Sequence, residues 1–216
     1  SILNVVSAVN FSDTSTAADA SILNQNAFLR FSDSASAGNA SINNIDRGVV
    51  QFFGNSTAGN ATITIAGPTF VAGTSSVNFA DTSTAGNSVI TGDGRSEINF
   101  SGNATAGNAI ITNNNKLTFG DSSEAGAATI TNNSQLIFND SSTAGASNIV
   151  NNDRIMFNGQ SLAGGAHIAN NGYVGFTGNS NGSGATITNS ANAVVDLSGS
   201  TGFSGDGRLS VGSFIG

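Results

Sequence analysis

Residues 100–119 read FSGNATAGNAIITNNNKLTF, and they hold one complete period of a repeat that runs through most of the 216-residue chain. The last five members of the repeated phenylalanine series stand 19 residues apart, whereas the earlier spacings are 20, 21, 27 and 21 residues. The series is Phe11, Phe31, Phe52, Phe79, Phe100, Phe119, Phe138, Phe157 and Phe176, and Leu197 continues it after 21 more residues. A fixed period of this kind is typical of solenoid proteins, in which equivalent positions of successive repeats stack.

Three further columns keep their register with the phenylalanines. An aliphatic residue stands two positions before each Phe, a small residue nine positions after it, and an isoleucine eleven positions after it. The isoleucines are Ile22, Ile42, Ile63, Ile90, Ile111, Ile130, Ile149, Ile168 and Ile187. Because side chains alternate across a strand, the motifs L-x-F and A-x-I predict two short strands, each pointing two residues inward. The motifs lie an odd number of positions apart, so the chain must bend between them and close a coil.

One such coil cannot bury its apolar side chains alone, so neighbouring coils must stack at the ~4.8 Å spacing of paired strands. The sequence therefore predicts an all-β fold, a parallel β-helix (solenoid) of about ten coils of 19–27 residues with the nine phenylalanines in its core. We expect residues 1–197 to form these coils, starting in mid-repeat. Residues 198–216 are expected to form a last irregular coil or the start of a following segment.

Two kinds of dipeptide are expected to mark the corners of the coils. Asn-Asn pairs occur at 113–114, 132–133, 151–152 and 170–171. Asparagine tolerates the left-handed backbone of a tight corner, and its amides can bond from coil to coil as a ladder. Ala-Gly pairs recur from 37–38 to 163–164, where glycine is expected to supply a positive φ.

The composition excludes several classes of partner. Charged residues make up only 9% of the chain, the formal net charge is −7, and there are six Lys and Arg residues. Phosphate recognition needs clustered Lys and Arg, so no nucleic-acid partner is expected. The chain has no Cys for a disulfide or a thiolate metal site, and no segment approaches the ~20 apolar residues of a membrane span. We expect no cofactor and no insertion into a membrane.

The repeat units, for instance residues 100–119, resemble those of passenger domains of autotransporters from Gram-negative bacteria. The final residues 195–216, VDLSGSTGFSGDGRLSVGSFIG, look like the segment that follows such repeats in large adhesin-like members. The resemblance covers nearly the whole chain. It implies a right-handed β-helix, secretion through a C-terminal β-barrel and display on the bacterial cell surface.

The resemblance leads to a functional expectation. The chain is expected to be a cell-surface adhesin passenger segment, a monomeric stalk or binding rod that projects from the outer membrane. Its expected partner is a host-cell or extracellular-matrix ligand, either a glycan or a protein. Passenger domains share this scaffold across many roles, so the fold does not define an activity.

A basic column is one candidate binding surface. Arg47, Arg95, Lys116 and Arg154 stand 16 residues after a Phe, a position that Gln135 and Tyr173 also occupy. These cations could line a stripe for acidic glycans or other anionic host ligands. Asp46 and Asp153 stand beside two of them, so local pairing and solubility explain the column equally well.

The 27-residue spacing between Phe52 and Phe79 marks an insertion that includes residues 67–73, GPTFVAG, with the only Pro of the chain. Loops on rigid scaffolds often carry function, and a looped-out Phe70 would then be a ligand contact. The alternative is that residues 69–71 form an extra strand packed on the rod. The sequence leaves residues 64–76 open between these two structures.

Metal binding and catalysis are not expected. Acids stand two residues after the phenylalanines at Asp13, Asp33, Asp81, Asp121 and Asp140, and glycine takes this position in four other repeats. Stacked carboxylates could bind calcium, but exchange with glycine favours a turn in which Asp bonds to nearby backbone amides. His167, the only His, alternates outward between Ala166 and Ile168 and lacks a nucleophile at a fixed spacing. We expect no enzyme.

The rival hypothesis is an ice-binding β-solenoid, since ranks of Thr, Ser and Asn with little charge suit ordered water. The threonine column five residues after the Phe is interrupted by Glu124 and Leu162, which weakens this hypothesis. Its members are Thr16, Thr57, Thr84, Thr105 and Thr143. A polysaccharide-active enzyme ranks third, because the chain shows no clustered acid, base or cation site.

Overall fold

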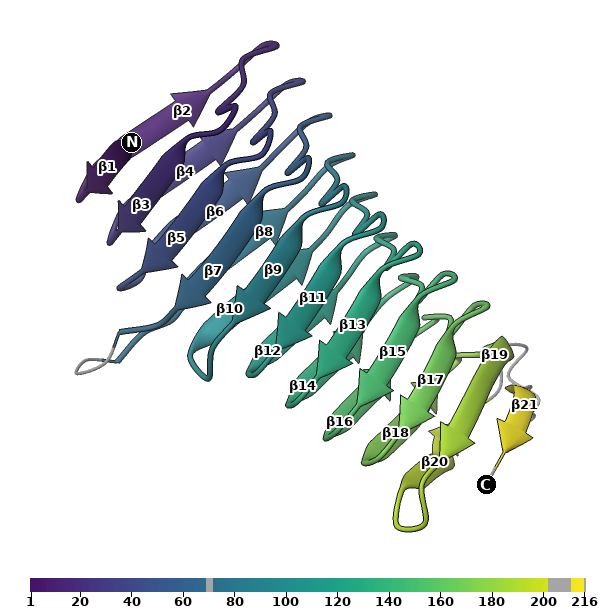
Figure 1. The fold of residues 1–216 in the computed structure, drawn as a ribbon. Coiled ribbons are helices and arrows are strands. Elements are labelled where there is room, and N and C mark those ends of the chain that lie inside the picture. The colour runs from purple at the N-terminus through teal and green to yellow at the C-terminus, as the bar shows by residue number, and fades with distance from the viewer. Residues whose placement is uncertain (69–71, 202–210, 216) are drawn as a thin grey trace.

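The computed structural model describes residues 1–68, 72–201 and 211–215, and within them it contains 21 β-strands in two parallel sheets and no helix that could span a membrane. Sheet A holds the odd-numbered strands (Figure 1): β1 (Ile2–Val5), β3 (Ser21–Gln25), β5 (Ser41–Ile45), β7 (Thr62–Ala66), β9 (Val89–Gly92), β11 (Ile110–Asn113), β13 (Thr129–Asn132), β15 (Asn148–Asn151), β17 (His167–Asn170), β19 (Gly182–Asn189) and β21 (Val211–Ile215). Sheet B holds the even-numbered strands: β2 (Ala8–Phe11), β4 (Phe28–Phe31), β6 (Val49–Phe52), β8 (Ser75–Phe79), β10 (Ser96–Phe100), β12 (Lys116–Phe119), β14 (Gln135–Phe138), β16 (Arg154–Phe157), β18 (Tyr173–Gly178) and β20 (Val194–Ser200). The predicted parallel β-solenoid of about ten coils is confirmed.

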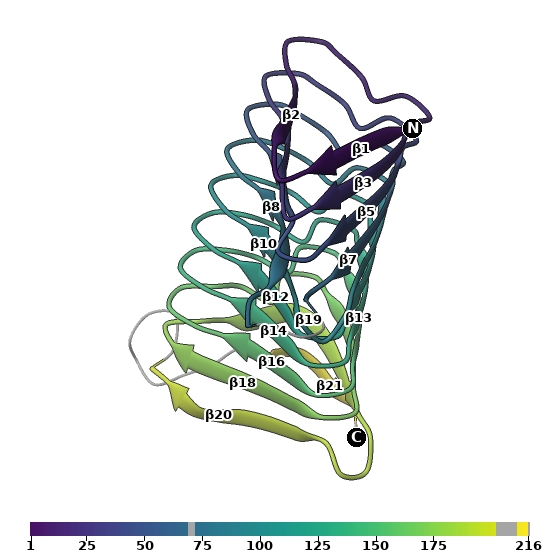
Figure 2. The ribbon, with the colours of Figure 1, turned by 90° about the vertical axis from the view of Figure 1, so that its left-hand side faces the viewer.

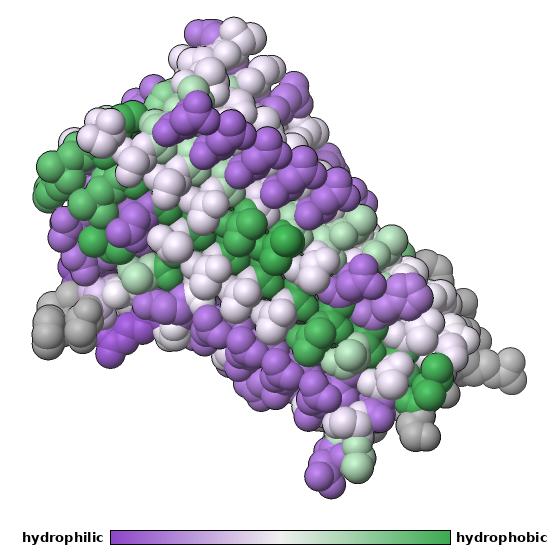
Figure 3. All heavy atoms as spheres, viewed as in Figure 1, coloured by the Kyte–Doolittle hydropathy of each residue, from purple (hydrophilic) through white to green (hydrophobic). Residues whose placement is uncertain are grey.

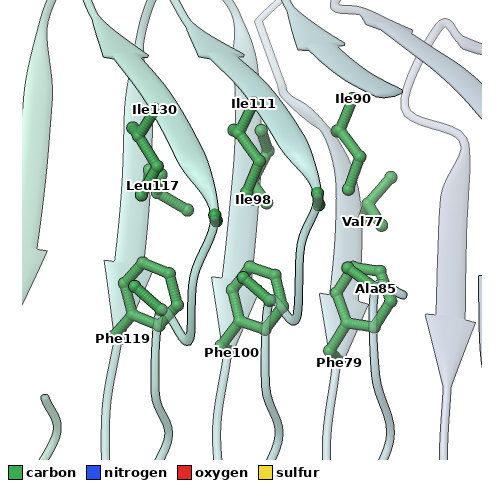
Figure 4. Packing of buried hydrophobic residues seen from close by; sticks show 14 of the residues in the cluster. Val77, Phe79, Ala85, Ile90, Ile98, Phe100, Ile111, Leu117, Phe119 and Ile130 are labelled. Carbon is green, nitrogen blue, oxygen red and sulfur yellow. The ribbon is translucent and has the colours of Figure 1, made fainter. Parts of the chain in front are cut away.

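The phenylalanines form one continuous stack along the inside of sheet B. Consecutive rings from Phe11 to Phe176 have centroids 4.7–4.9 Å apart and planes within 5–10° of parallel. Figure 4 shows three of these rings beside the file of aliphatic side chains. All are fully buried except Phe11, which is partly exposed and packs against the core. The register follows from the sequence, because each Phe is the Cα partner of the Phe in the next coil.

A third side closes each coil between sheet B and sheet A (Figure 2). It holds single-residue parallel bridges, such as Thr84 to Thr105, rather than full strands. The bridging residue lies between two small buried ones, as Ala104 and Ala106 flank Thr105. Small side chains on this side leave room for the phenylalanines that face them, which lets a narrow interior fill without voids.

The Asn-Asn pairs adopt a different structure from the predicted one. The first Asn of each pair is the last residue of a sheet A strand and points inward, fully or almost fully buried. Left-handed backbone occurs instead in the same turn of earlier coils, at Asn26 and Asp46. The predicted coil-to-coil ladder is confirmed, because Asn113 donates to Asn132 at 2.7 Å and Asn132 donates to Asn151 at 2.8 Å.

The Ala-Gly corners are as predicted. Seven glycines, at 38, 59, 86, 107, 126, 145 and 164, have φ between +59° and +64°. A Cβ added to Gly145 would lie 2.6 Å from the carbonyl oxygen of Gly126 in the preceding coil. These corners therefore need glycine both for its backbone conformation and for the close approach of neighbouring coils.

The regular stacking changes near the end of the chain. The register between β18 and β20 shifts between Gly175 and Thr177, and Leu197 is 40% exposed rather than buried in the phenylalanine stack. The stack of aromatic rings ends at Phe176, and Leu197 lies at the register shift in β20, the last strand of sheet B. β20 runs to Ser200, and β21 pairs with β19 at the end of sheet A.

Candidate functional site

Two of the four predicted ligand-binding cations hold the insertion in place. Arg47 donates through Nε and Nη2 to the carbonyl oxygen of Ala72 at 3.1 and 2.8 Å. Arg95 donates through Nη1 to the carbonyl oxygen of Pro68 at 2.6 Å. Pro68 and Ala72, on either side of residues 69–71, are therefore each bonded to an arginine of a neighbouring coil turn. Phe70, the predicted contact residue, and the alternative strand at residues 69–71 lie outside the described residues.

The other two cations lie in sheet B, in a different column. Lys116 and Arg154 begin β12 and β16, and the Cα partner of Lys116 in β10 is Glu97 rather than Arg95. The single basic column does not exist, because the spacings that contain Arg47 and Arg95 hold extra residues in the turn before the next sheet B strand. The guanidinium carbon of Arg154 lies 5.4 Å from the centre of the Tyr173 ring.

Tyr173 also forms a hydrogen bond that shifts two pKa values. Its hydroxyl donates to Oδ2 of Asp196 at 2.7 Å, and this bond, followed by burial, raises the pKa of Tyr173 above 10.0. Hydrogen bonds from Ser198 and then Tyr173 lower the pKa of Asp196 from 3.8 to about 2. A shallow hollow of about 280 Å³ nearby is lined by Gln135, Leu136, Ile137, Arg154, Met156 and Asn158. The outer face of sheet B is thus mixed, with charged, aromatic and apolar groups.

The acids that follow the phenylalanines belong to the corners. Asp13, Asp33, Asp81, Asp121 and Asp140 all have positive φ between +53° and +58°. Oδ2 of Asp140 accepts from the backbone N–H of Asp121 at 3.1 Å, so the bond joins two coils instead of closing an Asx turn within one. Among the described residues, no group of three or more His, Cys, Asp or Glu side chains is placed to hold a metal ion.

The outer face of sheet A has a different character over four adjacent coils. We call its outward-pointing side chains on β7, β9, β11 and β13 the threonine face; Thr112 and Thr131 are half-buried and the other six are exposed. One file consists of Thr62, Val89, Ile110 and Thr129, and the other of Thr64, Thr91, Thr112 and Thr131. None of these eight side chains is charged, and Val89 and Ile110 are 38% and 52% exposed. The two files are in register, residue for residue, across the four strands.

Most hydroxyls of the second file are not used within the protein. Thr64 donates to Oδ1 of Asn43 at 3.2 Å, whereas Thr91, Thr112 and Thr131 have no side-chain hydrogen bond among the described residues. The threonines five residues after the Phe, in contrast, use their hydroxyls within the protein. Oγ1 of Thr105, for example, accepts from the backbone N–H of Gly107 at 3.0 Å, which closes the Ala-Gly corner.

Asparagine ladders run along both flanks of the threonine face. On one side, the amides of Asn60, Asn87 and Asn108 each donate to the preceding Asn at 3.1–3.3 Å. On the other side, Asn133 donates to Asn114 at 2.8 Å. Figure 3 looks onto this sheet, with pale and green residues along the middle of the face and purple ones mostly toward its flanks. The result is a neutral strip of hydroxyl and aliphatic groups bordered by amides.

Farther along sheet A the two files change in composition. His167 is exposed on this outer face, as its strand position predicts, and Ala169 follows it in the second file. A hollow of about 260 Å³ lies around them, with Thr129, Asn148, Val150, Thr186 and Thr188 among its lining residues. The Thr-x-Thr pattern returns at residues 186–188.

The threonine face was detectable in the sequence but was missed. The motif Thr-Ile-Thr occurs at 62–64, 129–131 and 186–188, in each case around an isoleucine that was predicted to point inward. Strand alternation then places both threonines on the outside. Comparison with family models, with curated proteins and with solved structures finds no match.

Proposed function

We propose that this chain is a rigid β-solenoid segment of an autotransporter-like passenger, displayed outside a Gram-negative cell as an adhesive rod. In this proposal its core sets the shape of the rod and its outer side chains contact host-cell or matrix ligands. The observation that carries the proposal is the unbroken phenylalanine stack from Phe11 to Phe176. Such a stack gives every coil the same rise and leaves the outer residues free to vary.

The distribution of charge supports adhesion through a lateral face. Both flat sheets expose a whole file of outward side chains per strand position, so a ligand can contact several coils at once. Lys116 and Arg154 lie on sheet B with Gln135 between them in register, which provides a place for anionic ligands. Arg47 and Arg95 act instead as anchors of the insertion.

The test is a glycan and matrix-protein array probed with the folded chain at two salt concentrations. We expect salt-sensitive binding that weakens in the double variant Lys116→Gln, Arg154→Gln, because exposed charges act over roughly a Debye length and are screened by salt. Arg30→Gln is the matched control, since Arg30 is also a cation of sheet B. It lies several coils away from Lys116 and Arg154, and it contacts Phe28 in its own strand and Gln51 in the next coil. No binding to any ligand of the array would contradict the adhesive role.

A further inference from the structure

The threonine face differs from the other repeated outer surfaces in how its polar groups interact. The corner threonines bind glycine amides, and sheet B carries Arg30, Glu97, Lys116 and Arg154 on its outer side. On the threonine face, the hydroxyls of Thr91, Thr112 and Thr131 have no side-chain hydrogen bond in the described part of the chain. They are therefore available to solvent or to a ligand that repeats with the coils.

The face is also held rigidly. Ile63, Ile90, Ile111 and Ile130 lie directly beneath it, all with 0% exposure, and backbone ladders fix each strand to its neighbours. Threonine, valine and isoleucine are branched at Cβ, which restricts their χ1 rotation. The hydroxyls and methyl groups thus repeat with the coils, whose rise is 4.7–4.9 Å as given by the phenylalanine rings.

Water beside such a surface experiences two complementary effects. Methyl and aliphatic groups form no hydrogen bonds, so the adjacent water keeps its bonds to other water molecules in restricted orientations. A hydroxyl donates one bond and accepts others, so it can replace a water molecule in such a network. A charged group would bind its hydration shell too strongly to join a neutral lattice, and the eight residues of the face include none.

From this combination we propose that the threonine face binds the surface of ice. The occupant is a neutral lattice of water molecules that meets the two files across β7, β9, β11 and β13. The hydroxyls anchor lattice water and the aliphatic groups between them exclude water in other orientations. Because the groups are already ordered before contact, binding costs little additional conformational entropy. The inference deepens the proposed rod function by giving one lateral face a partner, and it rests on that function only for the rigid rod.

The experiment measures thermal hysteresis and ice-crystal growth under a cryomicroscope with the whole chain. We expect the unmodified chain to show hysteresis and to shape growing crystals. Thr131→Lys should abolish most of that activity, because it places an ammonium group and its hydration shell within the contact, on β13. Ser141→Lys is the matched control, since it adds the same charge to the same coil in the exposed turn after β14, outside sheet A, and should leave the hysteresis unchanged.

A second variant, Thr112→Val, keeps the shape of the side chain and removes only the hydroxyl. It should reduce hysteresis while its circular dichroism spectrum and thermal midpoint stay close to those of the unmodified chain. Absence of hysteresis in the unmodified chain, or equal loss in Ser141→Lys, overturns the inference. The inference is also overturned if hysteresis is absent and Thr131 is required instead for binding to crystalline polysaccharide or for dimerisation measured by sedimentation. The glycan and matrix-protein array tests the adhesive role separately, because its result does not depend on whether the chain binds ice.

Discussion

The phenylalanine stack and the threonine face repeat along the same coils, but only the first stays uniform. Nine phenylalanines follow one another without substitution from Phe11 to Phe176, whereas the outer files change from Thr131 to Val150 to Ala169 in successive coils. A buried column has one shape to fill, so any other side chain there leaves a cavity or a clash. An outward column has no such constraint. Repetition on the inside therefore reports the fold, and a run of like residues on the outside needs another explanation.

The largest effect should follow from breaking the interior stack at a ring that has a neighbour on both sides. Phe138→Ala removes a fully buried ring that lies 4.9 Å from Phe119 and 4.8 Å from Phe157. We expect a loss of about 3–5 kcal/mol in the free energy of unfolding, measured by chemical denaturation. Thr131→Val in the neighbouring sheet A strand serves as the exterior control and should change stability by less than about 0.5 kcal/mol. Equal losses in the two variants would contradict the division between interior and exterior.

The asparagine ladders offer the same comparison with one residue type. Asn132 is fully buried, and its amide nitrogen donates to Asn151 and to the carbonyl oxygens of Ser134 and Arg154 at 2.8–2.9 Å. Asn132→Ala leaves buried groups unpaired, which costs about 1–3 kcal/mol for each. Asn133→Ala removes the adjacent Asn, whose ladder bonds are exposed. In parallel thermal denaturation, Asn133→Ala should lower the midpoint much less than Asn132→Ala. A larger decrease in the midpoint for Asn133→Ala would refute a special role for the buried ladder.

A smaller effect is expected at the corners that close the third side. Gly145→Ala forces an alanine to adopt φ of +61°, at a cost of about 1–2 kcal/mol, and its Cβ would also clash with the carbonyl of Gly126. Gly165→Ala is the control, because a Cβ there would meet nothing closer than 3.7 Å. Denaturation of the two variants should rank Gly145→Ala as clearly less stable. Similar midpoints would show that the corner relaxes without cost.

How far sequence predicts this molecule depends on which side of the strand a residue occupies. The Phe and Ile files were predictable because strict spacing reveals buried columns. The buried role of Asn132 was not, because asparagine is more often a corner residue and polar groups are rarely placed in a core unless bonded. Spacing from the preceding Phe predicts one column for Arg95 and Lys116. The turn before Ser96 holds two extra residues, so Glu97 and not Arg95 is the neighbour of Lys116. The threonine face was also predictable from alternation, because the residues on both sides of each inward-pointing isoleucine must point outward. The strands were recognised from their inward residues, so the outward ones were not compared from coil to coil.

The smallest expected effect concerns the exterior bond between Tyr173 and Asp196. Tyr173 is the only Tyr and the chain has no Trp, so its ionisation can be followed by ultraviolet absorbance. The raised pKa of Tyr173 means that its contribution to stability is complete below pH 10.0 and is lost as the pH rises through the folded-state value. The contribution of Asp196, whose pKa is lowered, is complete above pH 3.8 and is lost as the pH falls through about 2.

Asp196→Asn should bring the Tyr173 titration back toward 10.0, because it removes the charged acceptor that holds the phenol protonated. Asp140→Asn removes the same charge at a corner that bonds to Asp121 instead, so it should leave the titration unchanged. An unchanged Tyr173 titration in Asp196→Asn would mean that this exterior bond does not form in solution. The buried asparagine ladder would still persist in that case, because its amide groups are shielded from water. The exterior pair of Tyr173 and Asp196, in contrast, exchanges its hydrogen bond with water.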